Sequence, residues 1–294
     1  MNKKTSPFPY IGGKFYMLND ILNLLDYSKT AYIELFGGSG KVLINKPTHQ
    51  IEIYNDIDDL LVNIFLQLQK NCDEIIKKLL ELPYSEKLWC EFNNDYRIKK
   101  FKNDDDIMKA VKYLYLFYTT FAGKKDMSSF SFGFEKRVIS EYYNNVINLK
   151  LIVNRIKNVI FLCRDYKSIL NSILNNNNSD VMIYADPPYF ECETHYVVYK
   201  KRKMKELLFT KEDHYILADY LNKLNKLNCS IMISYKAHPE IEKLYSRDNW
   251  FYIETKETNF CNLNINKVGE ERNKKSFRKE WIIMNYKPFQ LRLF

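Results

Sequence analysis

The chain has 294 residues, of which 46% are hydrophobic and 28% charged, and this balance excludes an intrinsically disordered protein. The net charge of +9 favours a polyanionic partner or an acidic surface. The six cysteines show no paired CxxC spacing, and Cys192 with His195 has no second ligand pair, so we expect no metal site. The opening MNKKTSPFPY lacks a signal peptide's apolar segment, and no apolar run reaches spanning length, so we expect a cytoplasmic protein without a membrane segment.

The first 70 residues alternate helices and strands. Apolar residues at helical spacing predict a first helix in residues 14–27. A strand at 30–36 ends in a glycine turn and a short helix, and a second strand at 49–56 leads into a helix at 60–69. This order is typical of a doubly wound α/β sheet.

Residues 71–150 have a different character, because they are helical and polar and show no convincing strand before residue 128. The parallel pattern then returns. We expect the later strands at 158–163, 181–186, 229–235 and 280–286, and the later helices at 165–174 and 211–225. The sequence therefore predicts an α/β sheet domain made of residues 1–70 and 151–294, with residues 71–150 as an inserted, mainly helical domain.

The run DPPY, Asp186 to Tyr189, ends one of the buried strands. Two consecutive prolines remove two backbone donors and fix φ twice, so neither a helix nor a central strand can continue. The result is a rigid ledge that offers one carboxylate, several backbone carbonyls and one aromatic face.

The run FGGSG, Phe36 to Gly40, lies between a strand and a helix, where glycines allow a ligand to approach the backbone. A Walker loop is excluded because Leu35 and Val42 stand where it requires Gly and Ser or Thr. The dinucleotide fingerprint also fails, since Leu43 occupies its third glycine position. A tight turn that binds no ligand remains the alternative.

Asp56 ends the second strand, where a carboxylate accepts hydrogen bonds from ribose hydroxyls in nucleoside-binding α/β folds. It could instead, or also, be the N-cap of the following helix. A ribose acid without a phosphate loop favours a nucleoside over a nucleotide. The run PFPYIGGK adds Tyr10 and Lys14 around another glycine pair, with a simple turn and helix start as the alternative, and Asp165 follows a further strand end.

Taken together, these runs resemble the Dam-type (alpha-class) site-specific DNA adenine methyltransferases, in the order of that family and over nearly the whole chain. The matching runs are PYIGGK, ELFGGSG, YND, DPPY, FTKEDH at 209–214, ISY at 233–235 and EWIIMNY at 280–286. The resemblance implies a Rossmann-like S-adenosylmethionine-dependent methyltransferase sheet with an inserted target-recognition domain. It also implies methyl transfer to the exocyclic N(6)-amino group of an adenine flipped out of duplex DNA.

The resemblance assigns roles to the residues of these runs. It implies catalysis by Asp186, Pro187 and Tyr189. It implies S-adenosyl-L-methionine contacts at Tyr10, Gly12, Lys14, Phe36, Gly37, Gly38, Ser39, Gly40, Asp56, Asp165 and Asp186. The adenine amino group is a poor nucleophile because its lone pair is delocalised into the ring. A carboxylate and a rigid carbonyl that accept its two N–H bonds favour a pyramidal nitrogen aimed at the methyl group.

The basic runs supply candidate DNA contacts at Lys124, Lys125, Lys200, Lys201 and Arg202, although each could equally lie in a solvated loop. The Arg-rich hairpin and Phe-Asn pair of relatives that methylate GATC are absent from FAGKKDMSSFSFGF, so GATC is not assumed. We expect a bacterial or phage-encoded monomer or weak dimer, with a cognate restriction endonuclease as a possible partner. The alternatives are an N(4)-cytosine methyltransferase, which more often has Ser in place of the acid, and an inactive DNA-binding relative.

Overall fold

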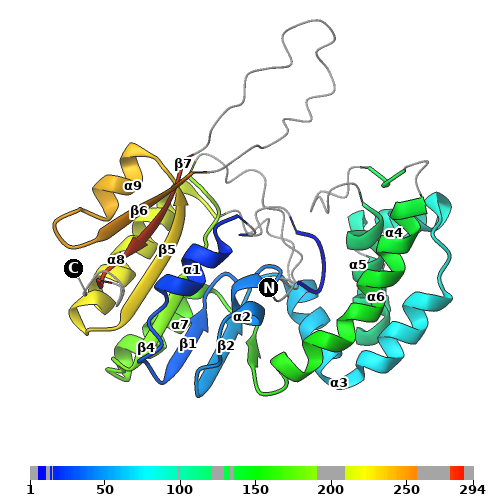
Figure 1. Cartoon of the computed structure of the whole chain (residues 1–294), viewed down its shortest axis with the longest axis horizontal. Helices are drawn as coiled ribbons and strands as arrows, with labels where there is room; N and C mark the ends of the chain where they lie inside the picture. Colours follow the sequence, from blue (N-terminus) through cyan, green and yellow to red (C-terminus); the bar gives the residue numbers. More distant parts are fainter. Residues whose placement is uncertain are drawn as a thin grey trace, which may run out of the picture.

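The computed structural model describes residues 6–10, 14, 16–98, 100–120, 129–132, 136–190, 209–256 and 279–287. Within these ranges the strands form one mixed seven-stranded sheet in the order β3-β2-β1-β4-β5-β7-β6 (Figure 1). Strands β1 to β5 run parallel to one another, and β7 lies antiparallel between β5 and β6. The strands are β1 (Ala31–Glu34), β2 (Ile51–Asn55), β3 (Ile160–Leu162), β4 (Val181–Ala185), β5 (Ser230–Lys236), β6 (Phe251–Lys256) and β7 (Lys279–Met284).

Helices cover both faces of the sheet, which confirms the predicted Rossmann-like α/β class. The helices are α1 (Leu18–Leu24), α2 (Lys41–Asn45), α3 (Asp59–Glu81), α4 (Glu86–Arg97), η1 (Lys100–Asn103), α5 (Asp106–Thr119), α6 (Lys136–Ile156), α7 (Tyr166–Asn175), α8 (Lys211–Lys226) and α9 (Pro239–Leu244). Successive residues of a strand pack on opposite faces of the sheet. On β1, Tyr32 belongs to the hydrophobic core formed with α1, α2 and α3, and Ile33 belongs to the core formed with α7 and α8. Because both faces are covered, the inner strands read as continuous apolar runs.

Helices α3 to α6 gather beyond the β3 edge of the sheet (Figure 1). Helix α3 packs against both α5 and α6, and its backbone departs from helical geometry at Asn71, with φ −132° and ψ 29°. Both α3 and α6 continue past the expected domain limits at residues 70 and 150. The sheet and the helical region therefore share these two helices.

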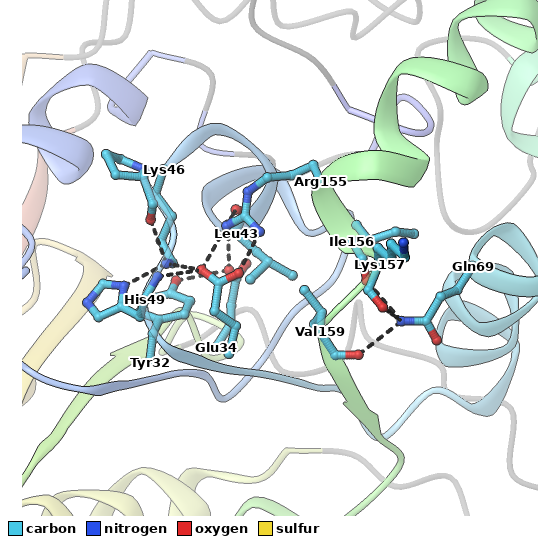
Figure 2. Close-up of polar contacts among 12 residues, drawn as sticks. Tyr32, Glu34, Leu43, Lys46, His49, Gln69, Arg155, Ile156, Lys157 and Val159 are labelled. Carbon is cyan, nitrogen blue, oxygen red and sulfur yellow. Dashed lines mark hydrogen bonds and ion pairs between the residues drawn. The ribbon is translucent and has the colours of Figure 1, made fainter.

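A buried ion cluster fixes the end of α6 to the sheet (Figure 2). The Arg155 guanidinium donates to both carboxylate oxygens of Glu52 on β2, at 2.5 and 2.8 Å, and to the carbonyl of Leu43 in α2, at 2.5 Å. Lys46 donates to the same carboxylate and lies 4.1 Å from the ring centroid of Tyr32. The Glu52 side chain is 6% exposed, so each charge depends on the others for its compensation.

Gln69 of α3 provides a second attachment beside this cluster (Figure 2). Its side-chain amide donates to the carbonyls of Ile156, Lys157 and Val159, at 2.9, 3.0 and 3.2 Å. These carbonyls lie where α6 ends and the chain enters β3, so they have no partner within the helix. The two attachments hold the base of the helical region against the β2–β3 side of the sheet.

Three elements differ from the sequence expectation, and one of them is helix α9 (Pro239–Leu244), which is not predicted. The first helix is shorter than predicted, since it spans Leu18–Leu24 and not residues 14–27. Strand β6 is not predicted at all, because FYIETK at 251–256 lies on the sheet edge and mixes exposed apolar with charged side chains. Among the helices that the structure describes, none is long and apolar enough to cross a membrane.

Candidate functional site

The predicted site residues gather at one edge of the sheet, where β1, β2 and β4 end. Because these strands are parallel, their carboxyl ends share that edge, which is where ligands bind in open α/β sheets. Strand β7 is antiparallel, so it contributes its first residues to the same edge: Glu280 pairs with Lys236, the last residue of β5. The site is therefore built from four strand ends and the N-terminal arm.

The glycine turn after β1 packs tightly against β2. The Gly37 amide donates to the carbonyl of Asn55 at 2.8 Å, and a side chain at Gly37 would place its Cβ 2.0 Å from the ring of the buried Tyr54. Gly38 has a φ of +51°, which favours glycine. The Tyr54 hydroxyl donates to the Gly38 carbonyl at 2.7 Å, so the backbone of the turn is held both at the Gly37 amide and at the Gly38 carbonyl.

Asp56 is bonded to this turn. Its Oδ2 accepts from the Gly38 amide at 2.8 Å, and its Oδ1 accepts from the Asp58 amide at 2.9 Å. The expectation that Asp56 could be the N-cap of the next helix is wrong, because Asp58 is the N-cap of α3 and accepts from the Leu60 amide at 3.2 Å. A carboxylate has about four acceptor positions, so Asp56 keeps capacity for ligand hydroxyls.

Asn55, which the sequence analysis does not select, holds the ends of β1 and β3 together. Its side-chain amide donates to the carbonyls of Leu35 and Arg164, both at 3.0 Å, and its Oδ1 accepts from the Arg164 amide at 3.0 Å. Asp165 follows directly and is the N-cap of α7, accepting from the Lys167 amide at 2.9 Å. The signal for Asn55 was the YND run itself, in which only the acid was given a role.

The aromatic residues around the turn complete its walls. A Cβ at Gly38 would lie 3.1 Å from the ring of Tyr10, so the N-terminal arm covers the turn. Phe36 packs against Tyr166 and Phe209, with ring centroids 5.5 and 5.7 Å apart. Ser39 is buried and Gly40, with a φ of +62°, begins α2.

The ledge after β4 forms a second, charged group. The Lys14 ammonium lies 2.8 Å from Oδ1 of Asp186 and donates to the Tyr189 hydroxyl at 2.5 Å. The Tyr189 hydroxyl in turn donates to Oε2 of Glu280 at 3.0 Å. Pro187 is buried, and the Asp186 side chain keeps 21% of its surface exposed, although its Oδ1, which faces Lys14, is buried.

Burial controls the charge of these carboxyl groups. Desolvation raises the pKa of Asp186 to about 6, an effect that the Lys14 ammonium opposes and the Glu280 carboxylate reinforces. Burial, together with the charges of Asp186 and Glu280, also raises the pKa of Tyr189 well above its usual value, so its hydroxyl remains a donor. Asp186 is therefore ionised at neutral pH but gains a proton in mildly acidic solution.

Glu34 is a further buried carboxyl that was given no role. Its Oε2 accepts from the Tyr32 hydroxyl at 2.9 Å and from the Leu43 amide in the first turn of α2 at 2.7 Å. Desolvation raises its pKa to about 8, against the opposing effects of these two bonds and Lys46. An acid at the end of β1, in ELFGGSG, was the available signal, and the structure shows that it links β1 to α2.

Several predicted residues cannot be placed in this geometry. Gly12 and the candidate DNA contacts Lys124, Lys125, Lys200, Lys201 and Arg202 lie outside the described residues, as do Cys192 and His195. Within the described ranges, no group of three or more His, Cys, Asp and Glu side chains could hold a metal ion.

The fold and the edge site define an α/β protein of the Rossmann-like methyltransferase type. The family model described as D12 class N6 adenine-specific DNA methyltransferase matches residues 10–259, and the chain belongs to this family. The predicted family, enzyme class and adenine-specific DNA methylation are thereby confirmed, with DNA as the substrate of the family.

Curated relatives agree with this assignment. The methyltransferase M.MjaIII of Methanocaldococcus jannaschii is 26% identical over 310 residues, covering 96% of this chain and 100% of that relative. A DNA adenine methylase of Vibrio cholerae is 24% identical over 282 residues, covering 93% of this chain and 94% of that relative. M.FokI of Planomicrobium okeanokoites is 28% identical over 192 residues, which cover 63% of this chain and only 29% of that relative.

The chain also covers 44% of the modification methylase StsI of Streptococcus sanguinis, so it spans less than half the length of two of these relatives. Among solved structures, a methylase-like protein of Haemophilus influenzae aligns over 92% of this chain and 85% of its own, with 10% identity and a TM-score of 0.32. At that score, the likeness adds nothing to the fold assignment.

Proposed function

We propose that Asp186, Pro187 and Tyr189 form the methyl-transfer site, and that the methyl group comes from S-adenosyl-L-methionine held at the glycine turn. The observation that carries this proposal is the position of Asp186, whose partly exposed side chain lies on a proline-fixed ledge at the same edge of the sheet as the turn. The proposed product is N(6)-methyladenine in duplex DNA.

The turn suits a nucleoside with an uncharged sugar. Without side chains at Gly37 and Gly38, the turn packs directly against Tyr54 and Tyr10, and Asp56 has acceptor positions for ribose hydroxyls beyond the two amides that it already bonds. Tyr10 and Phe36 provide aromatic walls, and we assign Gly12, Lys14, Ser39, Gly40 and Asp165 to the same pocket. When bound, S-adenosylmethionine supplies a methyl group already activated on a sulfonium.

The residues of the chain then need to orient the adenine amino group and make the lone pair of its nitrogen available for methyl transfer. The Asp186 carboxylate and the Pro187 carbonyl accept the two amino N–H bonds of adenine, which favours a pyramidal nitrogen with its lone pair directed at the methyl group. The Tyr189 ring lies beside the flipped base, which must leave the duplex because its amino group is otherwise paired. The Lys14 ammonium lies 2.8 Å from Asp186 Oδ1, so the adenine amino group shares the carboxylate with Lys14 or displaces it.

DNA contacts are proposed from charge and from the helical region. We propose that residues 71–150 form the target-recognition domain, and that Lys124, Lys125, Lys200, Lys201 and Arg202 neutralise phosphates, in keeping with the net charge of +9. Phosphate contacts of this kind fix the orientation of the duplex but do not select the sequence. We also propose that the protein acts as a monomer or weak dimer in the bacterial cytoplasm, either alone or beside a cognate restriction endonuclease.

The experiment is single-molecule sequencing of genomic DNA from cells that express the wild-type protein, Asp186→Ala or the control Asp219→Ala. The control removes an acid that is 60% exposed on α8 and pairs with a neighbouring exposed lysine. Methyladenine in one recurring sequence in the wild type and the control, but not in Asp186→Ala, would support the proposal. Methylcytosine as the product, or methyladenine that persists in Asp186→Ala, would refute it.

A further inference from the structure

The EWIIMNY run at 280–286 is part of the resemblance to the adenine methyltransferases, but no residue in it has a role in the proposed chemistry. The structure brings its first residue, Glu280, to the site because β7 is antiparallel and begins at the ligand-binding edge. The backbone of Glu280 is paired on both sides, with Lys236 on β5 and with Thr255 on β6, whose hydroxyl also donates to its carbonyl at 3.2 Å. Its carboxylate is therefore presented from a firmly held strand.

We propose that Glu280 is a positioning residue for methyl transfer, which fixes the Tyr189 ring through its hydroxyl and adds a negative charge to the surroundings of Asp186. The inference rests on the function proposed above and extends it to a residue on another strand. It requires that Glu280 acts through Tyr189 and Asp186 and does not itself contact the adenine.

The direction of the hydrogen bonds supports the positioning role. The Tyr189 hydroxyl accepts from Lys14 at 2.5 Å and donates to Glu280 at 3.0 Å, so its single proton has one defined acceptor. If Glu280 were absent, that proton would be free to turn elsewhere, and the ring would lose one of its two polar attachments. The prolines already fix the backbone of the ledge, so the freedom that remains is rotation of the Tyr189 side chain. Glu280 restricts this rotation.

The charges around Asp186 support the electrostatic role. Lys14 of the N-terminal arm faces Asp186 with a positive charge, and Glu280 of β7 contributes the opposing negative charge. Glu34 of β1 and Tyr184 of β4 also interact with Asp186, but burial raises the pKa of both and keeps them largely neutral at pH 7. Beyond desolvation, the charge on Asp186 is thus governed mainly by Lys14 and Glu280, which both contact the Tyr189 hydroxyl.

The first test is a pH profile of single-turnover methylation for wild type, Glu280→Gln and the control Glu254→Gln. Glu280→Gln keeps an acceptor for the Tyr189 hydroxyl but removes the charge, so the acidic limb should move to lower pH by about half a unit or more. Glu254 lies on β6 in an exposed ion pair with Lys279, and its substitution should leave the limb in place. A profile of Glu280→Gln that superimposes on the wild type would overturn the electrostatic part of the inference.

The second test is a double-mutant cycle measured at pH 8, above the acidic limb. Glu280→Ala should lower the single-turnover rate by about tenfold in the wild-type background, the loss expected for a charged hydrogen bond. In a Tyr189→Phe background, which keeps the ring but removes the hydroxyl, Glu280→Ala should have no further effect. Equal losses in both backgrounds would overturn the positioning role.

These outcomes are separable from failure of the proposed function. If the wild type itself forms no methyladenine, the function fails. If the wild type is active and both the pH profile and the cycle show no dependence on Glu280, the function stands and the inference about Glu280 fails. A dissociation constant for S-adenosylmethionine within about twofold of wild type shows that each variant is folded.

Discussion

Removal of Lys14 tests whether its ammonium keeps Asp186 ionised. The ammonium lies 2.8 Å from Asp186 Oδ1, and the Lys14 side chain is only 7% exposed, so water screens this interaction poorly. Burial already raises the pKa of Asp186 to about 6 even with Lys14 in place. Lys14→Met keeps most of the apolar volume of the side chain and removes the charge.

The expected size of the effect follows from the pKa. An opposite charge at this distance lowers a carboxyl pKa by roughly 1–3 units, so its loss should bring the pKa of Asp186 to about 8. The ionised fraction of Asp186 at pH 7 would then fall from about nine-tenths to about one-tenth. The single-turnover rate of Lys14→Met should therefore fall about tenfold at pH 7 and recover most of that loss by about pH 9.

The assay is single-turnover methylation of saturating duplex DNA between pH 5.5 and 9.5. Lys223→Met is the matched control, because Lys223 is 56% exposed on α8 and pairs with Asp219 in the preceding turn of the same helix. Its profile should match that of the wild type. With S-adenosylmethionine also saturating, so that a weakened cofactor contact does not limit the rate, a Lys14→Met rate that stays low at every pH would refute the reasoning, since the loss would then not arise from the charge of Asp186.

Three further predictions concern the frame of the site. Burial raises the pKa of Glu34 to about 8, so the folded chain binds an extra proton between about pH 4.5 and 8 and loses stability as pH rises through that window. In urea titrations, the unfolding free energy of Glu34→Gln should therefore fall by roughly 3 kcal/mol less than that of the wild type between pH 5 and 8.5. Equal falls in the two proteins would contradict this. Arg155→Met should cost about 3 kcal/mol of unfolding free energy because Glu52 loses its bidentate partner. Lys150→Met, on the same helix but in an exposed pair with Asp73, should cost less than about 0.5 kcal/mol, and equal costs would exclude the cluster as an anchor. Gly37→Ala brings a Cβ within 2.0 Å of a buried ring, so calorimetry should show S-adenosylmethionine affinity reduced at least about tenfold, and an unchanged affinity with an unchanged melting temperature would contradict the packing argument.

Much of the sheet could be predicted from the sequence because its inner strands are covered on both faces. The runs at 30–36, 49–56 and 181–186 are apolar and end in glycine or aspartate, which places the glycine turn, Asp56 and Asp186 at strand ends. Once the strands are parallel, those ends share one edge. The edge strand β6 has no such signal, since only one of its sides is paired and its face is partly exposed.

The contacts between distant parts of the chain could not be predicted. Arg155 reaches Glu52 across 103 positions, and Tyr189 reaches Glu280 across 91. Neither pair lies in a local pattern, and the second depends on the antiparallel insertion of β7 between β5 and β6. The sequence could identify EWIIMNY as part of the family pattern, but only the topology shows why its acid reaches the site.

The central claim is that the ledge at Asp186 transfers a methyl group to adenine, and one measurement tests it most directly. Purified wild-type protein and Asp186→Ala are incubated with duplex DNA and isotopically labelled S-adenosylmethionine, and the DNA is digested to nucleosides for mass spectrometry. We expect label in N(6)-methyladenine alone for the wild type, and none for Asp186→Ala, with DNA binding by the variant largely retained. Label in N(4)-methylcytosine, or equal labelling of adenine by both proteins, would contradict it.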